Sequence, residues 1–156
     1  MTERLSIEEA FAKVALLSRL SDRQRERLAA HATTRSYGEG AMIVRQGDTS
    51  MSFYVVLQGR VRVEHEAEGR AGTSTLEELG PGGAFGEMGL IDDMPRAASV
   101  IAIEPSECAL LARWDFQNEL REDPEIALAL LPVLNARIRD LNARLARAES
   151  AGVPAP

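Results

Sequence analysis

The sequence predicts an α+β protein, an antiparallel β jelly-roll barrel flanked by N-terminal helices and a long C-terminal helix. Apolar residues recur at helical spacing near both ends of the chain. Between them, glycines separate short runs rich in β-branched residues, a pattern typical of antiparallel barrels. We expect a single domain over residues 1–149, with helices in 5–32, the barrel in 33–113, further helices in 114–149 and a flexible tail in 150–156.

The N-terminal segment predicts two helices. Over Leu5–Leu20 the apolar residues follow a helical period, and Ser6 with a glutamate three residues later predicts a capping box at the start. Ser21, with a glutamine three residues later, repeats this pattern for a second helix over Asp22–Ala32. Leu28 is the apolar residue expected to anchor that helix in the core.

Six strands are predicted in the central part of the chain. They are Met42–Val44, Phe53–Gln58, Arg60–Glu64, Thr73–Leu79, Ala98–Ile103 and Glu107–Ala112. The run Tyr54–Val63, YVVLQGRVRV, is interpreted as a hairpin that turns near Gln58-Gly59. Its second arm alternates valine with arginine, so one face should be buried and the other should face water.

Two helices are predicted after the strands, a short one over Trp114–Arg121 and a longer one with Asp123 as N-cap and Pro124 at its first position. The longer helix carries a stripe with the spacing of a coiled-coil seam, Leu131, Leu134, Ile138, Leu141, Leu145 and Ala148. This apolar seam fits either a homodimer or packing on the chain's own barrel. Pro132 should kink or break the helix.

Composition excludes several classes of function. The formal net charge is -6 over 156 residues, which argues against a nucleic-acid binder. The single cysteine, Cys108, can form neither an internal disulfide nor an iron–sulfur cluster, and we expect it in the core. His31 and His65 lack metal-ligand spacing, so we expect no metal. No apolar run is long enough to span a membrane, so we expect a soluble, cytoplasmic chain without membrane partners.

The stretch with the clearest chemistry is Pro81–Val100, PGGAFGEMGLIDDMPRAASV. It places Glu87 between glycines and Arg96 nine residues later, followed by two alanines. A guanidinium can donate two parallel hydrogen bonds to a phosphate, and an ionised carboxylate suits a sugar hydroxyl. Glycines allow the backbone to approach a ligand closely. The stretch therefore predicts a pocket for a small ligand with hydroxyl and phosphate groups.

The run FGEMGLIDDMPRAASV resembles the phosphate-binding cassette of cyclic nucleotide-binding domains, which occur in catabolite-activator-type regulators, protein kinase A regulatory subunits and cyclic nucleotide-gated channels. The resemblance implies that Glu87 holds the ribose 2′-hydroxyl and Arg96 the cyclic phosphate, with backbone amides of Gly86, Gly89 and Ala97 completing the cradle. The expected ligand-binding residues are Phe85, Gly86, Glu87, Met88, Gly89, Arg96, Ala97, Ala98 and Asn142. The alternative interpretation is that the glycines only form turns and that both charges are solvated.

The resemblance favours cAMP as the ligand but leaves cGMP open. In relatives that prefer cGMP, a threonine or serine often follows the phosphate-binding arginine, whereas this chain has Ala97. Base contacts in the family come partly from the C-terminal helix, where Leu141 and Asn142 fall about where some relatives place hydroxyl side chains. Asn142 can bond to a base edge, while Leu141 can only pack.

Our leading hypothesis is therefore a stand-alone sensor that binds cAMP and signals through its C-terminal helix to a separate, unknown effector protein. It is not an enzyme, because Ser99 and Ser106 near the cassette have no neighbouring histidine and no metal ligands are evident. Beyond the nucleotide it needs no cofactor. Only Ser150–Pro156 follow the long helix, too few residues for a DNA-binding domain. The alternatives are a ligand-free scaffold of the same fold and the sensor part of a transcription regulator.

Overall fold

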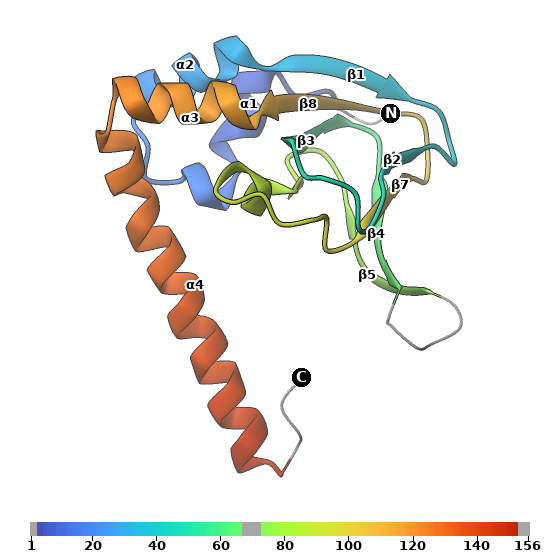
Figure 1. Cartoon of the computed structure of the whole chain (residues 1–156). Coiled ribbons are helices and arrows are strands. Elements are labelled where there is room, and N and C mark those ends of the chain that lie inside the picture. The colour runs from blue at the N-terminus through green and yellow to red at the C-terminus, as the bar shows by residue number, and fades with distance from the viewer. Residues whose placement is uncertain (1–2, 67–72, 153–156) are drawn as a thin grey trace.

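The computed structural model describes residues 3–66 and 73–152, which form two antiparallel sheets and a layer of helices (Figure 1). The helices are α1 (Ile7–Ala12), α2 (Asp22–His31), α3 (Arg113–Glu122) and α4 (Glu125–Ser150), with short 3-10 helices η1 (Ala15–Leu17) and η2 (Glu87–Leu90). The strands are β1 (Thr33–Tyr37), β2 (Met42–Val44), β3 (Ser52–Gln58), β4 (Val61–Glu66), β5 (Thr73–Leu79), β6 (Ala84–Phe85), β7 (Ser99–Ala102) and β8 (Ser106–Ala112). This arrangement confirms the predicted α+β jelly-roll-like fold.

Each sheet contains four strands. The first sheet has the order β1-β8-β3-β6 and the second has the order β2-β7-β4-β5, with every neighbouring pair antiparallel. The six predicted strands all form, within two residues of their expected bounds. The two strands that were not predicted are β1, whose sequence TTRSY is mostly exposed and has no apolar alternation, and the two-residue β6.

The predicted hairpin at Tyr54–Val63 is wrong. The chain does turn at Gly59, but β3 pairs with β8 and β6, whereas β4 pairs with β5 and β7 in the other sheet. The burial of β3 explains why it does not pair with β4: Phe53 to Leu57 are all buried, so both faces of the strand are covered. Alternate residues of this strand face two different apolar clusters, so β3 is a central strand of the sandwich and the turn carries the chain across to the second sheet.

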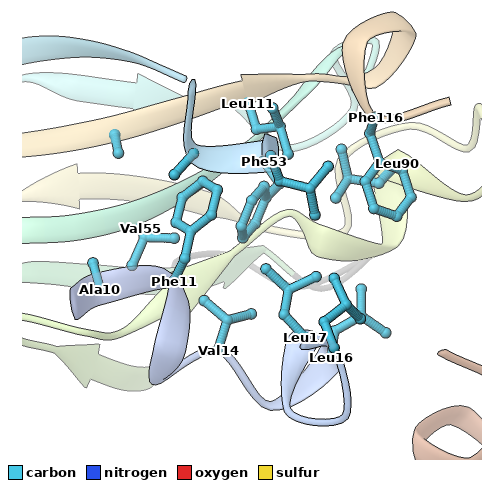
Figure 2. Close-up of a cluster of buried hydrophobic side chains, with 14 of the residues drawn as sticks. Ala10, Phe11, Val14, Leu16, Leu17, Phe53, Val55, Leu90, Leu111 and Phe116 are labelled. Carbon is cyan, nitrogen blue, oxygen red and sulfur yellow. The ribbon is translucent and has the colours of Figure 1, made fainter. Parts of the chain in front are cut away.

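The larger apolar cluster joins the N-terminal helices to the first sheet (Figure 2). The rings of Phe11 and Phe53 lie 5.6 Å apart between their centroids, and Phe116 of α3 is buried in the same cluster. The helix predicted over Leu5–Leu20 is shorter than expected, because α1 ends at Ala12 and η1 follows. The apolar period still continues through η1, since its leucines are buried in the same core.

The sequence signals at the helix starts are confirmed. Ser6 and Ser21 each accept a hydrogen bond from the backbone N–H three residues later, and the side chains of Glu9 and Gln24 return one to the cap residue. α4 starts one residue later than predicted, but the Asp123 carboxylate does accept a hydrogen bond from the Glu125 N–H. Leu28 and Cys108 are fully buried as expected, and burial raises the pKa of the Cys108 thiol to about 12.

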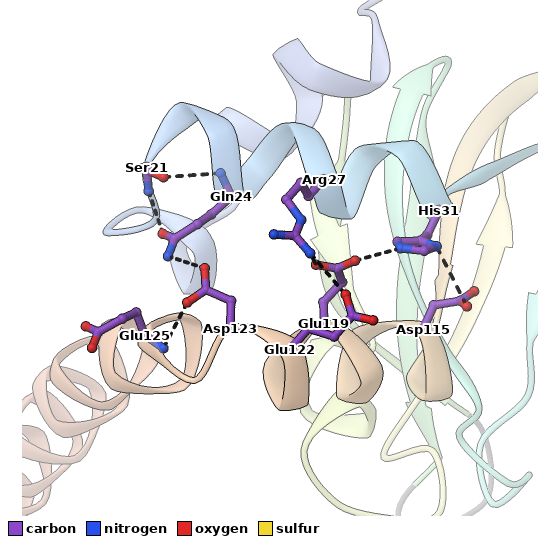
Figure 3. Close-up of polar contacts among 9 residues, drawn as sticks. All are labelled: Ser21, Gln24, Arg27, His31, Asp115, Glu119, Glu122, Asp123 and Glu125. Atoms are coloured by element: carbon purple, nitrogen blue, oxygen red, sulfur yellow. Dashed lines mark hydrogen bonds and ion pairs between the residues drawn. The ribbon is translucent and has the colours of Figure 1, made fainter.

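A polar cluster fixes α3 against α2 (Figure 3). Glu119 of α3 is buried, and its two carboxylate oxygens lie 2.9 Å from His31 Nε2 and 3.1 Å from Arg27 Nη2. Arg27 Nη2 also lies 3.1 Å from an oxygen of Glu122. These contacts hold α3, and therefore the start of α4, to the N-terminal helices.

α4 is one continuous helix that runs out beyond the two sheets (Figure 1). Pro132 lies inside it without breaking it. Ile126 and Leu130 are buried in the core, whereas Ile138 and Leu141 are 56% and 61% exposed. The seam therefore does not pack on the chain's own barrel beyond Leu134, which contacts the core. Ser150, which the sequence placed in the tail, belongs to α4, and residues 153–156 of the expected tail lie outside the described part.

Within residues 3–66 and 73–152, no helix is both long and apolar enough to cross a bilayer. The same part of the chain brings no three metal-ligating side chains of the His, Cys, Asp or Glu types together.

The turn at Gly59 predicts a large stability effect. Gly59 has a φ of 95°, and a Cβ there would lie 2.3 Å from Ser106 Oγ and 2.5 Å from the Pro105 carbonyl oxygen. Gly59→Ala should therefore lower the free energy of unfolding by about 2–4 kcal/mol. Gly38→Ala is the control, since nothing lies within 4 Å of its added Cβ. Urea unfolding measures both, and equal small losses would show that the turn relaxes easily.

Candidate ligand-binding site

A cavity of about 500 Å³ lies between the second sheet and the predicted cassette. Sites for small molecules typically enclose about 300–1,000 Å³. Eight of the nine predicted ligand-binding residues line this cavity: Phe85, Gly86, Glu87, Met88, Gly89, Arg96, Ala97 and Ala98. Asn142 does not, because it is exposed on the part of α4 that extends away from the sheets. The structure therefore brings the cassette residues together and leaves the predicted base contact apart from them.

Arg96 is a buried cation in the wall of this cavity. Only 9% of the residue is exposed, which contradicts the alternative that it is a solvated surface charge. Its Nη2 donates a hydrogen bond of 2.7 Å to the Ser52 carbonyl, and its Cζ lies 5.5 Å from the centroid of the Tyr54 ring. Its Nη1 is buried and finds no acceptor in the described part of the chain. A buried donor without an acceptor can donate a hydrogen bond to an anionic oxygen of a ligand.

The backbone on both sides of Arg96 is fixed by hydrogen bonds. The Arg96 N–H donates to the Asp48 carbonyl at 2.8 Å, and the Arg96 carbonyl accepts from the Gly47 N–H at 2.9 Å. Burial of the side chain lowers the pKa of the guanidinium from its ordinary value, because desolvation penalises the charged form. The nearby Tyr54 opposes this shift. An anion bound beside Arg96 would offset the same desolvation.

Gly86 shows why the cassette needs glycine. It is the N-cap residue before η2 and has a φ of 78°, in the left-handed region that other residues rarely adopt. A Cβ at this position would lie 2.1 Å from Arg96 Nη1. The missing side chain therefore leaves room for the guanidinium next to the backbone where η2 begins.

Glu87 follows directly and is partly buried in the cavity wall. One of its carboxylate oxygens lies 3.6 Å from Arg137 Nη1 on α4. Arg137 was not predicted at the site, since the pattern of α4 drew attention to its apolar residues. This ion pair links the cassette to the long helix.

The second sheet supplies an apolar wall that sequence reasoning did not assign to the site. Val44 on β2, Val100 on β7 and Val63 on β4 all line the cavity. Ser50, which is buried, and Glu77 on β5 also line it and were not predicted. The signal for Glu77 was present in the sequence, because it lies two residues before Leu79 and so on the same face of the strand.

The comparison with known proteins agrees with this geometry. The sequence profile of the cyclic nucleotide-binding domain matches residues 34–123, more than half of the chain. The chain belongs to the cyclic nucleotide-binding domain family. Domains of this family are regulatory sensors rather than catalysts, in agreement with the prediction that the chain is not an enzyme.

Two curated relatives carry the same domain. The cyclic AMP receptor protein of Thermus thermophilus is 38% identical over 111 residues, which cover 71% of this chain and 51% of the receptor. The cAMP-dependent protein kinase regulatory subunit of Dictyostelium discoideum is 37% identical over 118 residues, which cover 74% of this chain and 36% of the subunit. The chain therefore spans about half of the first relative and about a third of the second.

Solved structures show the same fold. The N-terminal domain of a transcriptional regulator from Streptomyces coelicolor A3(2) matches with a TM-score of 0.78 at 28% identity, covering 86% of this chain and 95% of that one. The catabolite activator protein of Thermus thermophilus matches with a TM-score of 0.73 at 32% identity, covering 87% of this chain and 63% of that one. The cyclic nucleotide-binding domain thus extends beyond the profile match to most of the chain.

The environment of Arg96 predicts that this residue contributes little to the stability of the free domain. Replacing it loses one hydrogen bond and the ring contact but removes a buried, partly unpaired charge, and these terms oppose each other. Arg96→Met should change the free energy of unfolding by no more than about 1 kcal/mol. Phe53→Ala, in the adjacent apolar core, should lose about 3–5 kcal/mol. A loss of that size for Arg96→Met in denaturant unfolding would instead give Arg96 a structural role.

Proposed function

We propose that this domain is a cAMP sensor that reports the bound nucleotide through α4 to a separate effector protein. The observation that carries the proposal is the buried Arg96 guanidinium, whose Nη1 lacks an acceptor among the described residues and which lines a cavity shared with Glu87. A phosphate supplies the acceptor that Arg96 Nη1 lacks, and a ribose hydroxyl can donate to the Glu87 carboxylate. A 3′,5′-cyclic nucleotide carries both groups on one rigid ring system.

The identity of Ala97 favours adenine over guanine in this proposal. Ala97 lines the cavity directly after Arg96 and has no hydroxyl to offer to a guanine amine. Both curated relatives described above are named for cyclic AMP, which supports the same choice.

The signal is proposed to leave through the second half of α4. Leu141, Asn142 and Leu145 are exposed and do not line the cavity, so they are free to cover a bound base after a movement of the helix. Arg137, one turn earlier, already touches Glu87 and keeps this part of α4 near the cassette. A nucleotide that contacts the helix only in the closed arrangement shifts the population toward closure.

The apolar seam has a second proposed use. Ile138, Leu141 and Leu145 are exposed along one helix, and their spacing fits pairing with the same helix of a second copy. Closure over the nucleotide and pairing in a homodimer would draw on the same side chains, so the ligand could change both together.

The proposed ligand leads to a direct binding prediction. The chain should bind cAMP with a micromolar or tighter dissociation constant, about -8 kcal/mol. Arg96→Ala should cost about 2–5 kcal/mol of binding, because it removes the cation that pairs with a desolvated phosphate. Glu87→Ala should cost about 1–3 kcal/mol, since its partner is neutral. Isothermal titration calorimetry measures all three.

The control for these substitutions is Arg60→Ala, which removes an arginine that pairs with Glu78 and does not line the cavity. It should leave the affinity unchanged. Calorimetry without heat, together with no thermal shift at millimolar cAMP, would contradict the proposed function. Equal and negligible effects at Arg96 and Glu87 would place the ligand elsewhere.

The proposed movement of α4 is tested by hydrogen exchange. Addition of cAMP should slow the amides of residues 138–147 as well as those of Gly86–Leu90, because closure places the helix over the ligand. The amides of α2, which lie outside the cavity, serve as the internal control. If only the cassette amides slow, α4 does not cover the nucleotide and the signal leaves by another route.

A further inference from the structure

The two most exposed large apolar side chains in the described part of the chain are methionines of the cassette. Met88 is 67% exposed and Met94 is 64% exposed, and both line the cavity. Exposed apolar side chains that gather at one place, rather than being scattered singly, mark a contact with another molecule. A molecule that enters the cavity therefore meets two thioethers that face solvent in the free domain.

Both methionines lie close in the sequence to the charged residues of the site. Met88 directly follows Glu87 in η2, and Met94 lies two residues before Arg96 in the turn that precedes β7. The Met94 N–H donates a hydrogen bond of 3.2 Å to Asp92 Oδ1, which fixes the backbone of this turn. Each methionine is therefore within two residues of a group that is proposed to bind the ligand.

An exposed thioether reacts with hydroperoxides, of which hydrogen peroxide is the simplest. The sulfur attacks one peroxide oxygen, so that an S–O bond forms and the O–O bond breaks. The sulfur loses two electrons, and the hydroxide that leaves takes the proton of the transferred hydroxyl and departs as water. The product, methionine sulfoxide, is polar where the thioether is apolar, and reductases convert it back.

We infer that Met88 and Met94 form a modification site at which oxidation by a hydroperoxide weakens nucleotide binding, an inference that rests on the proposed function. A nucleotide in the cavity covers both side chains, and covering a polar sulfoxide without a donor for its oxygen costs free energy. The negative end of the S–O bond also repels a phosphate. The coupling is reciprocal, so a bound nucleotide protects both sulfurs from the peroxide.

The exposed methionines have a second physical explanation that the experiment must separate. Their flexible, polarisable side chains suit an adaptable contact with a partner protein, whatever happens to the ligand. In that case oxidation leaves the affinity for the nucleotide unchanged. Met42 and Met51 are matched controls, because they are 43% and 40% exposed and do not line the cavity.

The first measurement follows oxidation of the full chain by hydrogen peroxide over time, with peptide mass spectrometry. At a cAMP concentration about ten times its dissociation constant, oxidation of Met88 and Met94 should slow about tenfold, in proportion to the free domain that remains. Met42 and Met51 should react at the same rate with and without cAMP. If cAMP binds and leaves all four rates unchanged, the inference is wrong.

The second measurement uses calorimetry with cAMP and compares each protein with itself before and after peroxide. Oxidation should lower the affinity of the wild type about tenfold, and methionine sulfoxide reductase should restore it. In the double variant with Met88→Leu and Met94→Leu, peroxide should have no effect on affinity, since leucine has no sulfur. The double variant with Met42→Leu and Met51→Leu should respond to peroxide as the wild type does. Unfolding curves check that both variants fold.

The outcomes distinguish the inference from the proposed function. If the wild type binds cAMP equally well before and after oxidation, the inference is wrong and the sensor function stands. The inference is also wrong if only the variant at Met42 and Met51 becomes insensitive to peroxide. If the unoxidised wild type does not bind cAMP, both the inference and the proposed function are wrong.

Discussion

The site depends on a buried guanidinium, that of Arg96, whose hydrogen-bond donors are not all paired. Arg96 gives one nitrogen to the Ser52 carbonyl and lies near the Tyr54 ring, but Nη1 has no acceptor among the residues that the structure describes. A buried charge in this state costs stability, and an anion that enters the cavity removes part of that cost. The guanidinium is already held in the cavity wall in the free domain, which lowers the cost of ordering it when an anion binds.

The two-sheet fold is what makes this burial possible. Ser52 and Tyr54 belong to β3, whose residues face an apolar cluster on each side, so the strand that holds the guanidinium is itself rigid. Gly86 gives the guanidinium room next to the backbone. Tyr54 also stacks on Phe85, with the ring centroids 4.9 Å apart, which ties the start of the cassette to the same strand. The cassette is therefore positioned by the core rather than by its own loop.

Local patterns predicted much of this structure, and pairing between distant segments explains the failures. The capping boxes at Ser6 and Ser21 and most strand bounds depend on neighbouring residues, so they could be read from the sequence. The connection made at Gly59 could not be predicted from the sequence. Both a hairpin and a crossover between sheets can use a glycine turn with φ above zero. Eight of the nine candidate site residues lie in the cavity wall, and all eight come from one short stretch of the chain, Phe85–Ala98. Arg137 and Glu77 come from other elements. Only tertiary structure places Arg137 at the cassette, and the strand pattern showed the face on which Glu77 lies but not the cavity that it lines.

The division of α4 into two parts decides how binding can be transmitted. Its first turns are fixed, since Ile126 and Leu130 are buried and α3 is held to α2 through Glu119. Its second half is exposed over residues 138–147 and contacts the cassette through the ion pair between Arg137 and Glu87. Pro132 lies between the two parts and cannot donate the backbone hydrogen bond that would stiffen the helix there. In the proposed mechanism, a change at Glu87 acts through Arg137 on the segment after the proline, and the anchored segment before it serves as the fixed support.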